Sequence, residues 1–312
     1  MHDESILIVT PDRKTQRTVQ RILGVTGYHV DIADALEQGM RLMQHRAPLL
    51  VVVDGNATTA PMADAFFAEA KAKGAEACMT LLAADAADHV PRILGLGAIT
   101  NLLVHQMPIL AEELTTTVHK LIRRDLFGAE KYLLWGSELF THTLSKASQR
   151  APLVSQIAEE VRARGQSARV ASMAMLVADE LLSNAVHNAP VDASGEHFRK
   201  DVARNIEIEL EPRETVKLRW GCDARYLAIE VTDQYGSIDR ETILRALAKN
   251  DIRETGGGAG MGIALAYRSC DHLVFNLAPG KRTEIIALID VRYPPSERAP
   301  VSSYNVFVER DS

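Results

Sequence analysis

The chain has 312 residues, of which 46% are hydrophobic and 24% are charged. This length and composition are enough for two hydrophobic cores of ordinary size. The formal net charge of −6 at pH 7 excludes the strongly basic surface of a typical nucleic-acid-binding protein, so we expect no nucleic-acid partner.

Membrane and secretion signals are not evident in the sequence. No apolar run approaches the roughly 20 residues of a membrane-spanning helix, and the acidic start at residues 1–4 is unlike a signal peptide. Cys78, Cys222 and Cys270 are scattered without the spacing of a metal site, which favours a reducing compartment. We therefore expect a cytoplasmic protein without a membrane partner.

The first 125 residues alternate short apolar runs with helical patterns. Continuous apolar strands that alternate with helices predict a parallel, doubly wound sheet that is covered on both faces. The predicted strands are residues 6–9, 27–30, 49–53, 79–83 and 99–104. Helical patterns lie at residues 15–24, 35–45 and 110–124.

This order resembles the receiver domain of response regulators, with Asp54 at the phospho-acceptor position after the third strand. A receiver also needs two acidic residues after its first strand, where this chain has Thr10 and Pro11, with Asp12 beyond. The lysine after the fifth strand is replaced by His105, which we interpret as a partly exposed loop residue. Phosphoryl transfer requires a cation and a lysine to neutralise the growing charge. We therefore expect residues 1–125 to form a pseudo-receiver, a docking or dimerisation domain in which Asp54 is inactive.

Residues 126–137 are a predicted connector. They leave no room for the two-helix hairpin with a phospho-acceptor histidine that a self-contained sensor histidine kinase needs. Trp135 is interpreted as interdomain packing. The apolar stripe of the helix at 110–122 is either receiver core or, together with Leu133, Leu134 and Trp135, the surface of a homodimer.

The helical pattern at residues 176–188 has an apolar stripe and a second, polar face. Glu180, Asn184, His187 and Asn188 share that polar face because they lie three to four residues apart. A carboxylate and an amide oxygen stacked in this way suit a hard cation and an attacking water or hydroxyl group.

Two further motifs follow in the chain. A strand at residues 227–233 ends in Asp233, and Gly236 follows it in a turn. Residues 256–262 contain five glycines in seven positions and run into a helix. Glycines of this density let the backbone approach a phosphate group, and the start of a helix offers it unpaired N–H groups.

Together these three motifs resemble the ATP-binding domain of the GHKL superfamily, which includes histidine-kinase catalytic domains, gyrase-type ATPases and anti-sigma-factor serine kinases. The resemblance implies a two-layer α/β sandwich with a mixed sheet over residues 138–312, which binds ATP and Mg²⁺. It assigns Asn184 to Mg²⁺ and Glu180 to a general base or water-orienting residue. The other implied cofactor contacts are Asn188, Asp233 and Thr283 (the latter two at adenine), Gly236 after Asp233, and Gly258, Gly260 and Gly262 at the lid hinge.

Some positions depart from the family's pattern. Tyr235 and Ser237 stand where the glycines that follow the adenine-binding aspartate are usual, and Thr283 lacks its preceding glycine. Efficient turnover is therefore less expected than ATP binding.

We accordingly expect a signalling regulator that binds Mg·ATP and controls a partner protein, either by serine or threonine phosphorylation or as a weak ATPase. The alternatives are a non-catalytic scaffold and a phosphorelay component that receives phosphate at Asp54.

Overall fold

The structure, a computed structural model, describes residues 4–57, 62–83, 101–105, 108–204, 206–248, 261–292 and 303–309. The chain divides into two compact units, Met1–Leu126 and Phe127–Ser312. The division falls inside the predicted connector, whose residues from Phe127 onward make their contacts mainly within the second unit.

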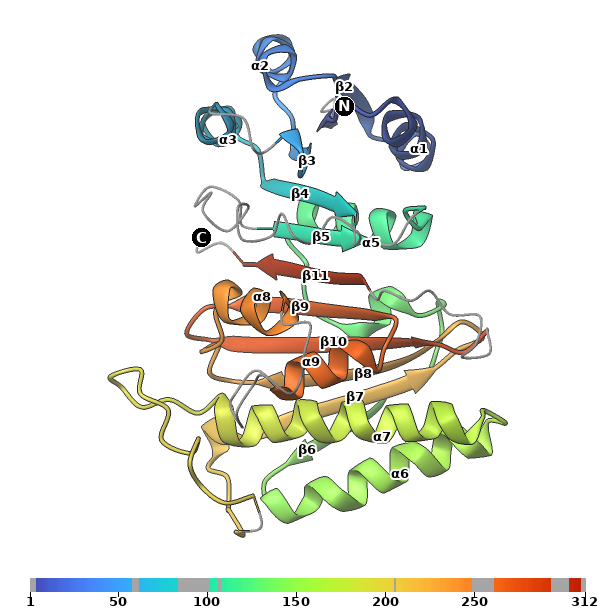
Figure 1. Cartoon of the computed structure of the whole chain (residues 1–312), viewed down its shortest axis with the longest axis vertical. Coiled ribbons are helices and arrows are strands. Elements are labelled where there is room, and N and C mark those ends of the chain that lie inside the picture. Colours follow the sequence, from blue (N-terminus) through green and yellow to red (C-terminus); the bar gives the residue numbers. More distant parts are fainter. Residues whose placement is uncertain are drawn as a thin grey trace. The chain divides into compact units, whose positions relative to one another are not determined.

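The first unit is a parallel sheet in the order β2-β1-β3-β4-β5, which is the doubly wound order of flavodoxin-like folds. Helix α1 packs with α5, and α2 packs with α3. Figure 1 shows α1 and α3 on opposite sides of the strands. The elements are β1 (Ser5–Val9), α1 (Arg13–Leu23), β2 (His29–Ala33), α2 (Leu36–His45), β3 (Leu50–Asp54), α3 (Ala63–Ala72), β4 (Ala77–Ala83), β5 (Asn101–His105) and α5 (Ala111–Ile122). The predicted doubly wound sheet is confirmed.

Two local expectations for this unit are wrong. The second strand begins at His29 rather than at residue 27, because Gly27 adopts a φ of +83°, which belongs to a turn. His105 is the last residue of β5 and only 4% exposed, so it is a buried strand residue and not a partly exposed loop residue.

The second unit is a mixed sheet in the order β11-β9-β10-β8-β7-β6. Strand β11 pairs with β9 in parallel, and the other neighbours are antiparallel. The strands are β6 (Phe140–Leu144), β7 (Val216–Cys222), β8 (Tyr226–Asp233), β9 (His272–Ala278), β10 (Arg282–Asp290) and β11 (Ser303–Val308). Strands β8, β9 and β10 match the apolar runs of the sequence.

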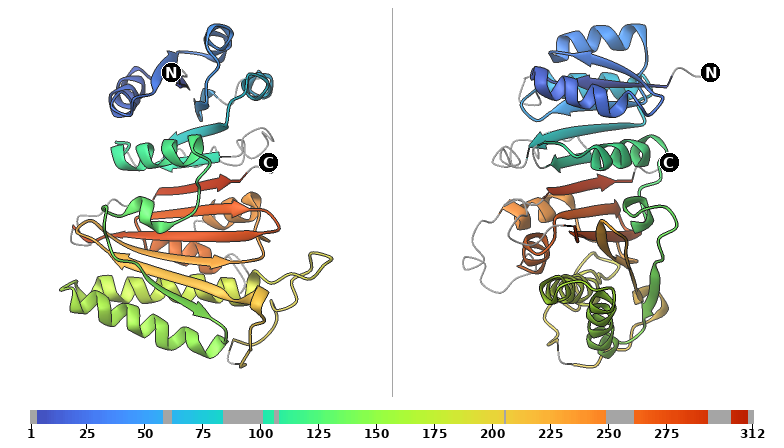
Figure 2. Two further views of the ribbon diagram at one scale, coloured as in Figure 1. Left: turned by 180° about the vertical axis from the view of Figure 1, so that it is seen from behind. Right: turned by 90° about the vertical axis from the view of Figure 1, so that its right-hand side faces the viewer.

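Helices cover one face of this sheet, as the right-hand view of Figure 2 shows. They are α6 (Arg150–Ala163), α7 (Ala168–Ser183), α8 (Arg240–Ala248) and α9 (Met261–Arg268). Helix α7 contacts α6, α9, β8 and β10. Its buried stripe is rich in alanine, which lets it approach the sheet closely, and the Ser167 hydroxyl caps it by accepting a hydrogen bond from the Val170 N–H at 3.2 Å.

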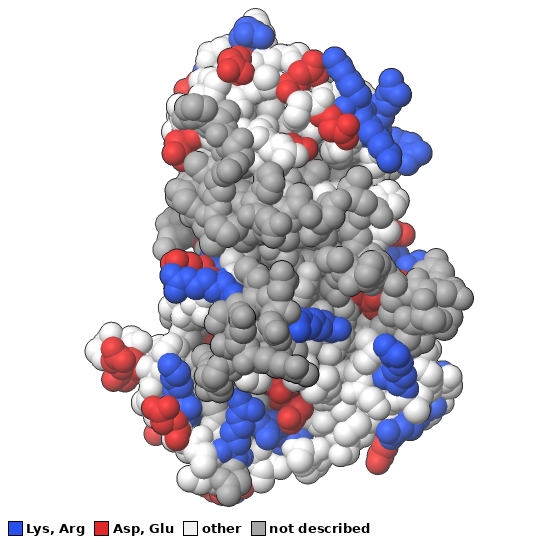
Figure 3. Space-filling view, viewed as in Figure 1, with Lys and Arg blue, Asp and Glu red and all other residues white. Residues whose placement is uncertain are grey.

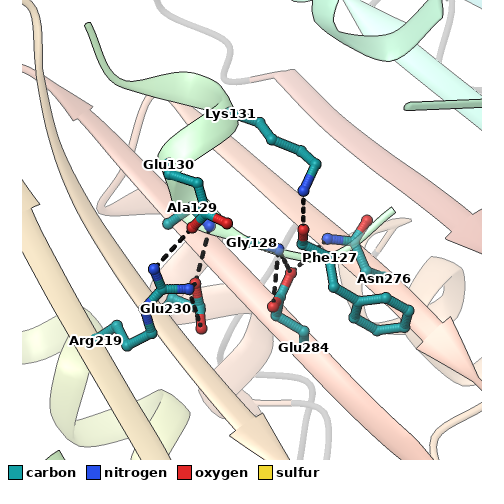
Figure 4. A network of polar contacts seen from close by, with 9 residues as sticks. All are labelled: Phe127, Gly128, Ala129, Glu130, Lys131, Arg219, Glu230, Asn276 and Glu284. Atoms are coloured by element: carbon teal, nitrogen blue, oxygen red, sulfur yellow. Dashed lines mark hydrogen bonds and ion pairs between the residues drawn. The ribbon is translucent and has the colours of Figure 1, made fainter. Parts of the chain in front are cut away.

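The connector lies on the opposite face of the same sheet (Figure 2). It forms the short 3₁₀ helix η3 (Ala129–Tyr132), whose first N–H groups meet two buried carboxylates. Gly128 N–H donates to both carboxylate oxygens of Glu284 at 2.9 and 3.1 Å, and Ala129 N–H donates to Glu230 Oε2 at 2.9 Å (Figure 4). Arg219 joins Glu230 to the exposed Glu130. The connector is thus part of the hydrogen-bonded structure of the second unit.

The connector also carries Trp135, which we expected to pack between domains. Its side chain is fully exposed, and that of Leu134 is about half exposed, whereas Leu133 is buried. Of these three apolar residues, only Leu133 therefore contributes to the hydrophobic core.

No helix in the described ranges is long and apolar enough to cross a membrane. All three cysteines lie in the described ranges, and none of them forms a disulfide bond. On the face shown in Figure 3, the described lysines and arginines of the second unit lie among acidic side chains.

Candidate functional site

The second unit contains a cavity of about 260 Å³ between the sheet and its helical layer. This volume is close to the lower end of the roughly 300–1,000 Å³ of small-molecule pockets. The lining comes from the end of α7 and the π-helical turn η5 (Asn184–Asn188), from β8 and β10, and from α8 and α9. Most of the wall is apolar, and the polar side chains Asn184, Asn188, Asp233 and Thr283 converge on it.

Asp233 provides a buried carboxylate at the end of β8. Its Oδ1 atom accepts hydrogen bonds from the backbone N–H groups of Tyr235 at 2.9 Å and Gly236 at 3.1 Å. Burial raises the pKa of Asp233, and these hydrogen bonds oppose that shift. Thr283 is its direct cross-strand neighbour on β10, with a buried hydroxyl. A carboxylate and a hydroxyl that lie side by side on adjacent strands can bind an amino group and an adjacent ring nitrogen.

Asn184 and Asn188 begin and end the π-helical turn that continues α7. Such turns are rare and frequently occur at functional sites. Asn188 Nδ2 donates to Asn184 Oδ1 at 2.7 Å, and Asn184 Nδ2 is buried without a hydrogen-bond partner among the described residues. Exchange of oxygen and nitrogen in both amides keeps their hydrogen bond and places the Asn184 oxygen where the unpaired nitrogen lies. An amide oxygen there is the kind of ligand that Mg²⁺ prefers, so these residues fit the cation that the family resemblance implies.

Glu180 lies directly beside the start of α9. A Cβ atom added to Gly262 would lie 2.5 Å from Glu180 Oε2 and 3.1 Å from Asn184 Nδ2, so a larger residue at this position would force the Glu180 carboxylate to move. The carboxyl group is half-buried, and burial raises its pKa, with Arg204 acting in the opposite direction. A carboxylate with a raised pKa is a better proton acceptor, which is the property of a general base.

The glycines of the predicted site have different positions. Gly262 touches Glu180 and Asn184 as described. Gly236, with a φ of +60°, packs against the turn between β9 and β10, while the next residues, Ser237 and Ile238, line the cavity. Gly258 and Gly260 lie outside the described residues.

Sequence reasoning missed four polar residues that line the cavity: His197, Lys200, Ser237 and Thr242. The Ser237 hydroxyl also donates to the Ala189 carbonyl at 2.7 Å, which joins the turn after β8 to the end of η5. His197 and Lys200 belong to an irregular segment between η5 and the next helix. Its residues show no hydrophobic periodicity, so the sequence does not predict that this segment reaches the cavity.

In the first unit, both carboxylate oxygens of Asp54 already have hydrogen bonds. The Thr10 hydroxyl donates to Oδ2 at 2.8 Å, and the Asn56 N–H donates to Oδ1 at 2.8 Å. Asp12 turns to its own helix, where Oδ2 accepts from the Thr15 N–H at 2.7 Å and caps α1. Thr10 thus occupies the side of Asp54 where a receiver of the usual type would bring acidic metal ligands.

We expect that acetyl phosphate with Mg²⁺ leaves the wild-type protein unphosphorylated. The reason is that, among the residues that the structure describes, no acidic pair joins Asp54 to hold a cation, and the growing charge on the phosphoryl group stays uncompensated. Intact-protein mass spectrometry measures the result, with Asp54→Asn as the control. A gain of one phosphoryl group in the wild type that is missing in Asp54→Asn contradicts the pseudo-receiver interpretation.

No protein-family model matches the chain, and no curated protein matches it either. Among solved structures, a response-regulator receiver domain protein from Clostridium thermocellum is 18% identical and covers 39% of this chain and 95% of its own, with a TM-score of 0.32. The receiver domain of NtrX from Brucella abortus is 19% identical and covers 38% of this chain and 98% of its own, again with a TM-score of 0.32. The strand order of the first unit, β2-β1-β3-β4-β5, is the flavodoxin-like order that receiver domains share with flavodoxin.

Proposed function

We propose that the second unit is a GHKL-type domain that binds Mg·ATP in the cavity, and that the protein is a signalling regulator that controls a partner protein. The observation that carries this proposal is the convergence of Asn184, Asn188, Asp233 and Thr283 on one cavity, with Glu180 in contact with Gly262 beside it. The four converging residues are spread over positions 184 to 283 of the sequence, and an incidental polar surface would not bring them together.

Each residue of the cavity would make a different contact with the nucleotide or with Mg²⁺. Asp233 accepts the adenine amino group, and Thr283 binds beside it. Asn184 contributes an oxygen ligand to Mg²⁺, and Asn188 orients that amide. Apolar side chains from β8, β10 and α9, among them Val231, Ile285 and Ile263, exclude water from the base.

Glu180 would accept the proton of an attacking water or of a serine or threonine hydroxyl. Mg²⁺, when bound, neutralises charge on the transferring phosphoryl group. Glu180, whose pKa is raised by burial, suits the role of this proton acceptor. Because Tyr235 and Ser237 depart from the family's pattern, Mg·ATP binding is the primary test of the proposal, and the rate of turnover is measured second.

Replacing Asp233 with asparagine is expected to weaken Mg·ATP binding by about 1–3 kcal/mol, because a buried amide presents a donor where the adenine amino group needs an acceptor. Isothermal titration calorimetry with Mg·ATP measures the change. Asp179→Asn is a matched control, because Asp179 pairs with Arg150 on the helix surface and does not line the cavity. If the wild type itself binds no Mg·ATP, the assignment of the site is wrong.

A second function, that of a non-catalytic scaffold, is favoured for the first unit alone. The hydrogen bonds of Thr10 and Asn56 to Asp54 support a docking role without phosphorylation there. The regulatory partner, the homodimer and the cytoplasmic location stay predictions.

A further inference from the structure

A long irregular segment follows the π-helical turn η5 and reaches the short 3₁₀ helix η6 (Pro212–Glu214). It returns toward the domain and brings His197 and Lys200 into the lining of the cavity. Lys200 is the one lysine or arginine among the residues described as lining it. Asp233, the acidic residue of the same lining, is the one that we assign to adenine.

The residue before Lys200 fixes this segment in place. Arg199 Nη2 donates to Glu214 Oε2 at 2.6 Å, and the two side chains are only 12% and 9% exposed. The same Glu214 oxygen also accepts from the Glu211 N–H at 2.8 Å. Although burial opposes it, the hydrogen bond from Arg199 lowers the pKa of Glu214, so the pair stays charged at neutral pH.

Glu214 is in turn joined to the strand that carries Asp233. The Tyr235 hydroxyl donates to Glu214 Oε1 at 3.4 Å, and Tyr235 is only 5% exposed. The Arg213 guanidinium lies 5.5 Å from the centre of the Tyr235 ring. Tyr235 stands where the family's pattern has a glycine, so the departure supplies an attachment that a glycine could not supply.

We infer that Lys200 binds the phosphate chain of the nucleotide, and that the Arg199–Glu214–Tyr235 network positions it. This inference rests on the proposed function of the cavity. An ammonium group is a strong partner for phosphate oxygens, and its four-carbon stem lets it follow them. Because Arg199 is anchored next to it, little of the segment's own backbone freedom is lost when Lys200 contacts the ligand.

The test compares ligands that share the base but differ in phosphate. Calorimetry with Mg·ATP and with adenosine is performed on the full chain and on Lys200→Met. We expect the variant to bind Mg·ATP about 10–100-fold more weakly, the usual loss for one hydrogen bond to a charged group, and adenosine with an unchanged affinity. Lys217→Met is the matched control, because Lys217 is an exposed lysine of the same unit that does not line this cavity, and it should change neither affinity.

A second variant tests the positioning network. Arg199→Met should lower the affinity for Mg·ATP. When Lys200→Met is added to this variant, the additional loss of affinity should be much smaller than the loss that Lys200→Met causes in the wild type. Circular dichroism confirms that each variant is folded. Equal losses for ATP and adenosine in Lys200→Met, or unchanged binding of both, overturn the inference while the proposed function stands. Failure of the wild type to bind either ligand overturns the proposed function itself and the inference with it.

Discussion

Replacing Glu180 with glutamine is expected to lower any ATP hydrolysis or phosphoryl transfer by about 10²–10⁴-fold, the usual contribution of a positioned proton acceptor. The amide keeps the size of the side chain next to Gly262, so the contact with the start of α9 is preserved. Affinity for Mg·ATP should therefore stay close to that of the wild type, since a base acts mainly in the transition state. Phosphate release and calorimetry measure the two quantities separately.

The pH dependence gives an independent check. Burial is the main cause that raises the pKa of Glu180, and the carboxyl group accepts a proton only when it is ionised. Activity should thus be full above the raised pKa and should fall as the pH falls through it, already at a pH where an ordinary glutamate is still ionised. This acidic limb should disappear in Glu180→Gln. Glu159→Gln, an exposed glutamate on the neighbouring helix α6, is the control. Equal rates for the wild type and Glu180→Gln would remove Glu180 from the chemistry.

The second large effect concerns stability. Glu230→Ala is expected to lower the free energy of unfolding by about 3–5 kcal/mol, the range for breaking a buried ion pair. Glu230 is 1% exposed, and its loss leaves Ala129 N–H and one side of Arg219 without their acceptor (Figure 4). The chain contains its own control in Glu130, which pairs with the same arginine at 2.7 Å but has a side chain 54% exposed.

Glu130→Ala should cost at most about 1 kcal/mol, because exposed pairs contribute little. Chemical denaturation, followed by tryptophan fluorescence, measures both variants. Both tryptophans, Trp135 and Trp220, belong to the second unit, so the signal reports on the unit in question. Equal losses in the two variants would mean that burial does not set the strength of this network.

Much of the first unit could be predicted from its sequence. Strands β1, β3, β4 and β5 are buried and therefore read as continuous apolar runs, which the alternation with helices places in a parallel sheet. The candidate cavity was partly predictable for a related reason. Asn184 directly follows helix α7, and Asp233 is the last residue of strand β8. The apolar patterns of these two elements predict where each begins and ends, and so they also predict the positions of the two side chains.

What the sequence could not predict depends on contacts between distant residues. Tyr235 reads as a departure from a motif, and only its contact with Glu214 explains it. Strand β7 alternates buried and less buried residues and lacks the continuous apolar run by which most of the other strands were predicted, and β11 was not predicted either. The exposure of the Trp135 side chain could not be predicted either, because its apolar neighbours Leu133 and Leu134 give no sign of it.

The two carboxylates that hold the connector have a consequence for communication within the second unit. Glu284 immediately follows Thr283 on β10, and Glu230 lies three residues before Asp233 on β8. Successive side chains of a strand point to opposite faces, so these two strands present the cavity on one side and the connector on the other. The backbone amide hydrogens of Gly128 and Ala129 are therefore built-in probes of the far side of the sheet. Their rates of exchange with deuterated water should register a ligand that stiffens β8 and β10, although neither amide touches it.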